Sequence, residues 1–198
     1  MNKKLLVSVL FCFLVFVHGT SLALAQVKAE DKEKELTTKL ALFLAEKGKL
    51  IIKEFYKLGK VGGSSRSKIE FTAVVIYEPG QEDERLRGLQ IEVTTSGGTY
   101  VKRETSFLDL EEIEGLLKAI DYIVNLSKEW KDVQKEYIET VFSTKDDFRI
   151  GFYQEGIKQK AFASSGTYGR VFCRFPMLQK LSSIKDIADK GLNLLNEK

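Results

Sequence analysis

The feature that most limits the possible folds is a regular alternation of apolar and polar residues between positions 69 and 107. The alternation has a period of two over 69–77, 89–94 and 101–107. That period is typical of strands that bury one face and expose the other. Pro79-Gly80 and the glycine pair within 96–99 supply turn residues. This stretch therefore predicts three antiparallel strands in a meander with one face toward water.

An amphipathic helix is expected directly after these strands. Asp109 is a good N-cap residue, and Glu112 three positions later completes a variant of the capping box. The apolar residues that follow recur at helical spacing and form one stripe: Ile113, Leu116, Leu117, Ile120, Ile123 and Val124. We expect this stripe to cover a sheet face, although a stripe of this kind can also dock a partner helix.

The second half of the chain repeats the order of strands followed by a helix. Strands are predicted at 137–143, 148–153, 158–164 and 170–175, and Pro176 then fits the first turn of a final amphipathic helix. Phe107, Leu110, Ile113 and Leu116 recur, offset by 68 residues, as Phe175, Leu178, Leu181 and Ile184. Either a duplication or the generic spacing of a strand that runs into a helix explains this match. The expected fold is α+β, with an antiparallel, meander-like sheet of about seven to eight strands and helices on one face.

The N-terminal third is less regular. Residues 36–44 fit a short helix that ends near Gly48. The run 50–58 fits either a helix or a strand, and its β-branched and aromatic content favours the strand. Residues 61–65 read as a flexible connection. The expected organisation is a signal segment at 1–25, a charged leader with a short helix at 26–48, and one domain at 49–198.

The first 25 residues have the features of a secretory signal peptide. Lys3 and Lys4 precede an apolar run at 5–17, which fits the 7 to 15 residues or so of a signal core better than the roughly 20 of a membrane span. Ala23 and Ala25 then form the small-x-small cleavage pattern, so Gln26 is the expected first residue after processing. The alternatives are an uncleaved membrane anchor and, less well supported, a lipid anchor. The lysine-led signal favours a bacterial protein that is periplasmic or secreted and meets the membrane only during export.

Removal of this segment changes the chemistry available to the rest. The formal net charge of +3 falls by two, because Lys3 and Lys4 are the only charged residues removed. With acids and bases interspersed, no nucleic-acid partner is expected. The sole histidine, His18, is also removed, which excludes Ser-His-Asp and Cys-His mechanisms and the commonest ligand of zinc. Cys173 remains as a single cysteine in a strand-like segment, where it is expected to be a buried small hydrophobic residue.

No motif predicts a catalytic, metal or cofactor site. The Gly-Ser segments at 61–67 and 164–169 lack the spacing of a phosphate loop or a Ser-Lys nucleophile, and the carboxylates at 111–114 and 146–147 lack that of a calcium loop. Aromatic side chains could line a ligand groove, although most are expected in the core: Trp130, Phe148, Phe152, Tyr153 and Phe162. Trp130, Tyr153 and Tyr168 are the candidates for a ligand or partner surface.

The leading expectation is a non-enzymatic exported domain that binds a protein partner or a small ligand through a sheet face or a loop. One alternative is a hydrolase that uses carboxylates or a Ser/Lys pair, which a cleft gathering two carboxylates would favour. Another is an envelope assembly or structural protein, which a large exposed apolar patch or a stable oligomer would favour.

Overall fold

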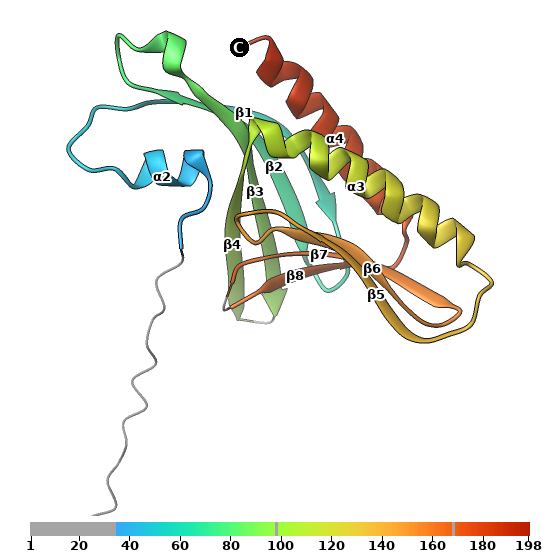
Figure 1. The fold of residues 1–198 in the computed structure, drawn as a ribbon. Helices are drawn as coiled ribbons and strands as arrows, with labels where there is room; N and C mark the ends of the chain where they lie inside the picture. Colours follow the sequence, from blue (N-terminus) through green and yellow to red (C-terminus); the bar gives the residue numbers. More distant parts are fainter. Residues whose placement is uncertain (1–34, 98, 168) are drawn as a thin grey trace, which may run out of the picture. The chain divides into compact units, whose positions relative to one another are not determined.

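The structure is a computed structural model that describes residues 35–97, 99–167 and 169–198 (Figure 1). The predicted signal peptide, its cleavage residues Ala23, Ala25 and Gln26, and Tyr168 lie outside the described residues. The described residues belong to one compact unit. The described part contains no helix that is long and apolar enough to cross a membrane.

Eight antiparallel strands build the unit, and the expected α+β class and strand number are confirmed. The strands form two sheets rather than one, each with its strands in sequence order. Sheet A contains β1 (Ile52–Gly62), β2 (Lys68–Tyr77), β3 (Leu86–Gly97) and β4 (Tyr100–Asp109), with a short 3₁₀ turn, η1 (Glu82–Glu84), between β2 and β3. Sheet B contains β5 (Lys135–Ser143), β6 (Arg149–Gly156), β7 (Lys158–Ser165) and β8 (Val171–Phe175).

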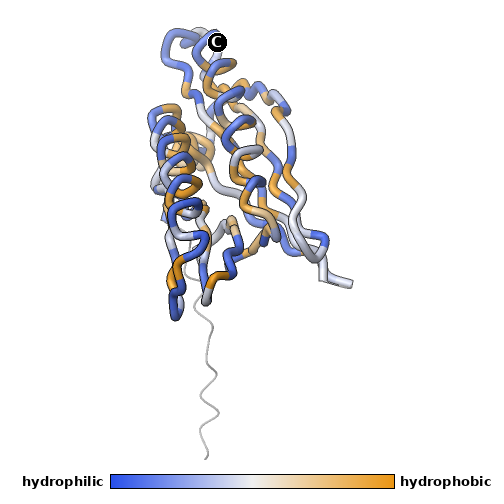
Figure 2. The backbone as a smooth tube through the Cα atoms, turned by 90° about the vertical axis from the view of Figure 1, so that its right-hand side faces the viewer, coloured by the Kyte–Doolittle hydropathy of each residue, from blue (hydrophilic) through white to orange (hydrophobic). Residues whose placement is uncertain are grey.

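A long helix follows each sheet, and the two helices lie side by side over the sheets (Figure 1). The first, α3 (Leu110–Glu129), contacts both sheets, whereas α4 (Gln179–Asn196) packs on sheet A. Lys185 of α4 bonds Asp121 of α3 at 2.7 Å. Figure 2 shows hydrophobic stretches alternating with hydrophilic ones along these elements. The stripe predicted from the sequence is in the core: Ile113, Leu116, Leu117, Ile120 and Ile123 are buried, and Val124 is partly buried against them.

The order of four strands and a helix thus occurs twice. Leu178 stands just before α4, as Leu110 opens α3, and Leu181 and Ile184 are buried like Ile113 and Leu116. One detail of the expectation is wrong. Helix α4 begins at Gln179, so Pro176 lies in the bend before the helix rather than in its first turn.

The first strand is longer than expected. The choice of a strand over a helix for 50–58 is confirmed, but β1 begins at Ile52 and continues to Gly62, so 61–62 belong to the strand and not to a flexible connection. The turn that follows is held against sheet B, because Ser64 donates from its backbone N–H to the carbonyl oxygen of Arg174 at 2.7 Å. Ser65 and Arg66 adopt positive φ angles of 54° and 55° in this turn. A tight turn docked on β8 replaces the expected loop.

A short helix, α2 (Lys39–Ala45), covers part of the outer face of sheet A. It ends before Gly48, whose φ of +81° lies outside the helix. Its N-terminus is capped from far along the chain, because the buried carboxylate of Asp109 accepts the backbone N–H groups of Lys39 at 2.9 Å and Leu40 at 3.1 Å. A small second core lies beneath α2, formed by Leu40, Val74 and Ile76 with Phe43, Leu44, Ile51, Leu86 and Phe107.

Gly88 allows α2 and β4 to approach β3 closely. A Cβ atom at this position would collide with the carbonyl oxygen of Leu108 and lie 2.5 Å from Cδ1 of Leu40. We therefore expect Gly88→Ala to lower the free energy of unfolding by about 1–3 kcal/mol, the usual cost of overpacking. Denaturant unfolding followed by circular dichroism measures the change.

The matched control is Gly62→Ala, because a Cβ there would meet nothing within 4 Å. Its effect should be under about 1 kcal/mol and stabilising, since alanine restricts the unfolded chain. Equal destabilisation by the two variants would show that the close approach at Gly88 is not what constrains this strand pair.

Candidate functional site

The structure separates two of the sequence candidates and brings one of them into a site. Trp130 is the C-cap residue of α3, and its ring meets the core residue Phe152 edge to face at 6.2 Å. Tyr153 is the next residue on β6 and points to the opposite, outer face of sheet B, because neighbouring strand residues alternate in direction. The two aromatic candidates therefore do not share a surface.

Four aromatic rings cross the outer face of sheet B, one from each strand. Tyr137 of β5 stacks on Tyr153 of β6 at 6.3 Å, Tyr153 lies 6.5 Å from Phe162 of β7, and Phe162 lies 6.4 Å from Phe172 of β8. The row is continuous because cross-strand register places these positions near one another on one face. A shallow cavity of about 370 Å³ lies along them. We call it the aromatic groove; it is lined by Tyr137, Glu139, Tyr153, Phe162, Arg170, Phe172 and Arg174.

The two ends of the aromatic groove carry opposite charge. Glu139 lies at the β5 end, where its carboxylate accepts the Tyr137 hydroxyl at 3.4 Å. Partial burial, followed by the nearby Glu139 charge, raises the pKa of Tyr137, so this phenol stays protonated as a donor. At the β8 end, the Arg174 guanidinium lies over the Phe172 ring at 5.3 Å, and Arg170 also lines the groove. The groove thus combines an apolar floor with an acidic end and a basic end.

Two polar atoms beside the β8 end have no hydrogen-bond partner among the described residues. Ser164 pairs with Phe172 on one side and with Arg149 on the other, and its side chain is 1% exposed. Its hydroxyl oxygen and the Arg149 Nε are both buried without a partner. Buried polar groups are nearly always bonded. Beside Phe172, the described residues therefore leave one hydroxyl and one guanidinium nitrogen without a hydrogen-bond partner.

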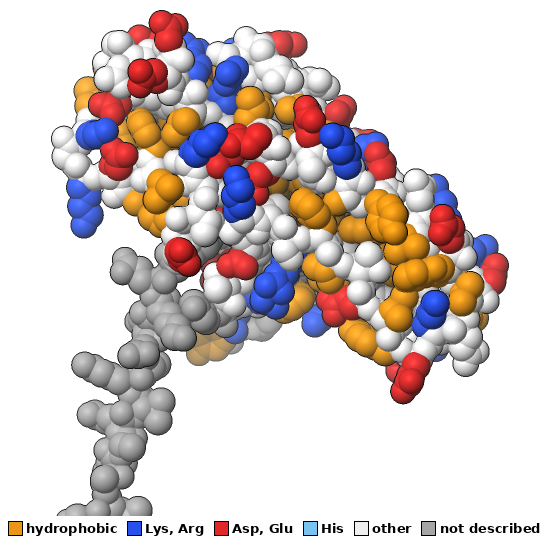
Figure 3. All heavy atoms as spheres, viewed as in Figure 1, with side chains coloured by type: hydrophobic (Ala, Val, Ile, Leu, Met, Phe, Trp, Pro, Cys, Tyr) orange, Lys and Arg blue, Asp and Glu red, His pale blue; other side chains and the backbone are white. Residues whose placement is uncertain are grey.

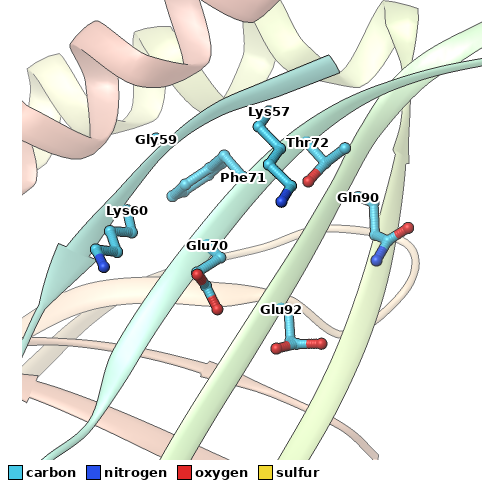
Figure 4. Close-up of a pocket in the computed structure, with 8 residues that line it drawn as sticks. All are labelled: Lys57, Gly59, Lys60, Glu70, Phe71, Thr72, Gln90 and Glu92. Carbon is cyan, nitrogen blue, oxygen red and sulfur yellow. The ribbon is translucent and has the colours of Figure 1, made fainter. Parts of the chain in front are cut away.

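A second hollow lies on the outer face of sheet A, in the part that lies beyond the small core under α2 (Figure 4). Its volume is about 460 Å³, and its lining is largely polar: Lys57, Gly59, Lys60, Glu70, Phe71, Thr72, Gln90 and Glu92. Glu70 stands directly opposite Glu92, which is the only pair of neighbouring carboxylates in this lining. Each is engaged by a cation, because Lys68 Nζ lies 2.5 Å from Glu70 and Arg103 Nε lies 3.1 Å from Glu92. The geometry is that of a charge-balanced surface more than that of an acid and base pair.

A third cavity, of about 550 Å³, lies where the end of α3 meets the start of α4. Val124, Met177 and Leu178 give it an apolar floor, and Lys128 and Lys131 stand at its rim. Among 35–97, 99–167 and 169–198 no group of three or more histidine, cysteine or acidic side chains is placed to hold a metal ion. The aromatic groove is the cavity in which stacking surfaces and groups of both charges converge, so we take it as the candidate site.

The comparisons with known proteins add no assignment to this site. No family model, no curated protein and no solved structure matches the chain.

The sequence identified part of the groove and missed the rest. Tyr153 and Phe162 line it, whereas Phe148 and Phe152 are fully buried in the core. Tyr137, Phe172 and the two arginines were not singled out. The signal that could have found them is their phase, since each occupies an outward position of a predicted strand whose alternate residues are apolar.

Cys173 is buried, as the sequence analysis expected, and its thiol faces the docked β1–β2 turn. Burial raises the pKa of the Cys173 thiol, while a hydrogen bond with Ser67 lowers it to a smaller extent. The thiolate, which is the reactive form, is therefore scarce at neutral pH. We expect no fast reaction of Cys173 with a disulfide reagent in the folded protein, and full reaction once guanidinium exposes it. Rapid labelling without denaturant, mapped to Cys173 by peptide mass spectrometry, would contradict this burial.

Proposed function

We propose that the protein is an exported, non-enzymatic binding protein that holds a small organic ligand in the aromatic groove. The observation that carries the proposal is the continuous row of four rings with two arginines at one end. Aromatic rings in such a row bind flat or apolar groups by stacking. The proposal therefore places the body of the ligand against the half-buried rings of Tyr153 and Phe172, with the 5% exposed ring of Phe162 between them.

The charges of the groove define the ligand further. Arginine is the side chain best suited to carboxylate, sulfate and phosphate groups, because its guanidinium presents several donors in one plane. Arg170 and Arg174 are at the same end, so the anionic group of the ligand lies there. The volume of about 370 Å³ suits a small molecule with one or two rings. The ligand class is thus a flat or apolar organic anion.

Binding is favoured over hydrolysis by the composition of the groove. Among the described residues that line the groove, Glu139 alone carries a carboxylate, whereas hydrolysis of a glycoside by carboxylates requires two. The arginines of the groove cannot act as bases at neutral pH. The lack of histidine in residues 26–198 also removes the commonest general base.

Export is part of the same proposal and rests on the signal-like N-terminus. If Lys3, Lys4 and the apolar run direct secretion and Ala25 precedes the cleaved bond, then processing leaves all of Lys34–Lys198 intact. We expect the protein purified from its host to have the mass of residues 26–198, measured on the denatured chain. The mass of the full 198 residues, or a first residue other than Gln26, would contradict this cleavage.

Ligand binding can be tested with two fluorescent probes of similar shape, the anion anilinonaphthalene sulfonate and the neutral phenylnaphthylamine. We expect Arg174→Gln to weaken binding of the sulfonate about tenfold, which corresponds to about 1.4 kcal/mol, because a charge-assisted contact is lost. Binding of the neutral probe should change little. Tyr153→Ala should weaken the binding of both probes, since it removes part of the stacking surface. Fluorescence titration gives each affinity.

The matched control is Arg103→Gln, which removes an exposed arginine from sheet A, away from the groove. It should leave both affinities unchanged. If Arg174→Gln and Arg103→Gln act alike on the sulfonate, the groove is not the anion site. Native mass spectrometry of the protein from its own host then asks which ligand is bound, and an added mass carried by wild type and lost in Tyr153→Ala would support the proposal.

A further inference from the structure

Strand β5 is an edge strand of sheet B and pairs only with β6. Unpaired strand edges present a row of free backbone donors and acceptors, and proteins usually protect them with charges, bulges or covering segments. The opposite edge of sheet B, at β8, has such a cover. Ser64 of the docked turn donates to the carbonyl oxygen of Arg174 from both its backbone N–H and its hydroxyl. Among the described segments no such cover lies on the edge of β5.

Strand β1, at one edge of sheet A, is an edge strand that this chain protects. Strand β1 carries Lys53, Lys57 and Lys60, and a bulge interrupts its register between Lys57 and Gly59. In β5 the irregularity lies at its start, between Lys135 and Ile138. The regular part that follows, 138–143, contains one charged residue, Glu139. The chain therefore protects the edge of β1 with lysines and a bulge, and it leaves most of the edge of β5 without either.

The surface beside β5 is apolar. Figure 3 shows hydrophobic side chains gathered over the region where α3 runs beside β5. Val141 and Tyr137 are 40% and 58% exposed on β5, and Tyr122 of α3 is 66% exposed. Ile138 and Phe142 are half-buried on the inner face of β5, where Phe142 packs against the core. An open strand edge flanked by such side chains is typical of an interface.

We infer that β5 pairs with β5 of a second copy of this chain, antiparallel and centred on Thr140, to join two sheets B into one eight-stranded sheet. In this register Thr140 faces its own counterpart, Glu139 faces Val141, and Ile138 faces Phe142. Each pair has both side chains on the same face of the sheet, as the pleat requires. The two apolar pairs of Ile138 with Phe142 stabilise the contact twice, once on each side of the axis.

Neighbouring registers of the same kind are less favourable. Centring on Glu139 would place two carboxylates directly opposite each other, which destabilises a strand pair. Centring on Val141 would place Ile138 opposite Thr144 and separate it from Phe142. The side chains of β5 thus favour one register for pairing with a second copy. Because β5 is complementary to itself in that register, we expect the partner strand to be β5 of a second copy and not an unrelated peptide.

This pairing extends the aromatic groove. The two-fold axis of an antiparallel pair stands perpendicular to the sheet, so the outer faces of both copies lie on the same side. Tyr137, the outermost ring of the row, would then stand opposite Ser143 of the second copy. The rows of four rings become parts of one continuous face, with the arginines at its two far ends.

The first test is the oligomeric state of the protein purified from its host, measured by sedimentation velocity over a range of concentrations. We expect a dimer that dissociates on dilution. Val141→Glu places a carboxylate directly opposite Glu139 of the second copy, once on each side of the axis, and should raise the dissociation constant at least tenfold because like charges repel. The matched control is Val101→Glu, because Val101 is also an exposed strand valine but lies in sheet A. A monomer at every concentration, or a dimer that Val141→Glu leaves unchanged, would overturn the inference.

The second test fixes the register. Directly opposite residues in antiparallel strands have Cα atoms about 4.5–5.5 Å apart, within the usual range of disulfides. Thr140→Cys should therefore form a covalent dimer under mild oxidation, with the bond mapped to position 140 by mass spectrometry. The control is Lys53→Cys in β1, and it should stay monomeric in electrophoresis under non-reducing conditions. Failure of Thr140→Cys to cross-link in a folded protein overturns the register and the pairing centred on it.

Discussion

The packing of α3 against two sheets at once is the contact on which the rest of the structure depends. Ile113, Leu116 and Ile120 of this helix are fully buried in a core that both sheets share. Strands β3 and β4 of sheet A also pack directly on β7 and β8 of sheet B, and the Ser106 and Ser165 hydroxyls are hydrogen-bonded at 2.6 Å across this contact. Apolar burial along α3 adds to this contact and covers apolar surface that each meander would otherwise leave exposed. Helix α4 then closes the remaining part of sheet A.

The elements of this fold could be predicted from local periodicity, whereas their grouping could not. The alternation at 69–77 and the stripe from Ile113 to Val124 identify β2 and α3, because each pattern reports which side chains face a core. Neither pattern shows whether strands that precede a helix pair with strands that follow it. The same strands could therefore form one sheet or two, and the sequence patterns would look alike. The β1–β2 turn was missed for a related reason. Its order comes from a bond between Ser64 and Arg174, which are far apart in the chain.

The candidate site was predicted in part for the same physical reason. Tyr153 and Phe162 stand out as aromatics in strands, but the groove is made by register, which brings one ring from each of four strands onto a single face. A sequence reading that treats Trp130 and Tyr153 as one surface overlooks the alternation between Phe152 and Tyr153. The arginines are less visible still, because Arg170 and Arg174 resemble ordinary solvated positions until Phe172 places a ring beneath one of them.

The repeated architecture gives a physical reason why sheet B and not sheet A offers the site. Both sheets have an inner face packed on helices and an outer face that the core does not need. In sheet A the apolar end of the outer face is occupied by α2, whose Leu40 is buried against Val74 and Ile76 and whose N-terminus is fixed by Asp109. In sheet B the described residues supply no equivalent helix, and the outer face carries four aromatic rings, of which Tyr137 is 58% and Phe162 is 5% exposed. Ring surface that stays in water costs free energy, so the exposed part of this row is where the proposed ligand would gain most by binding.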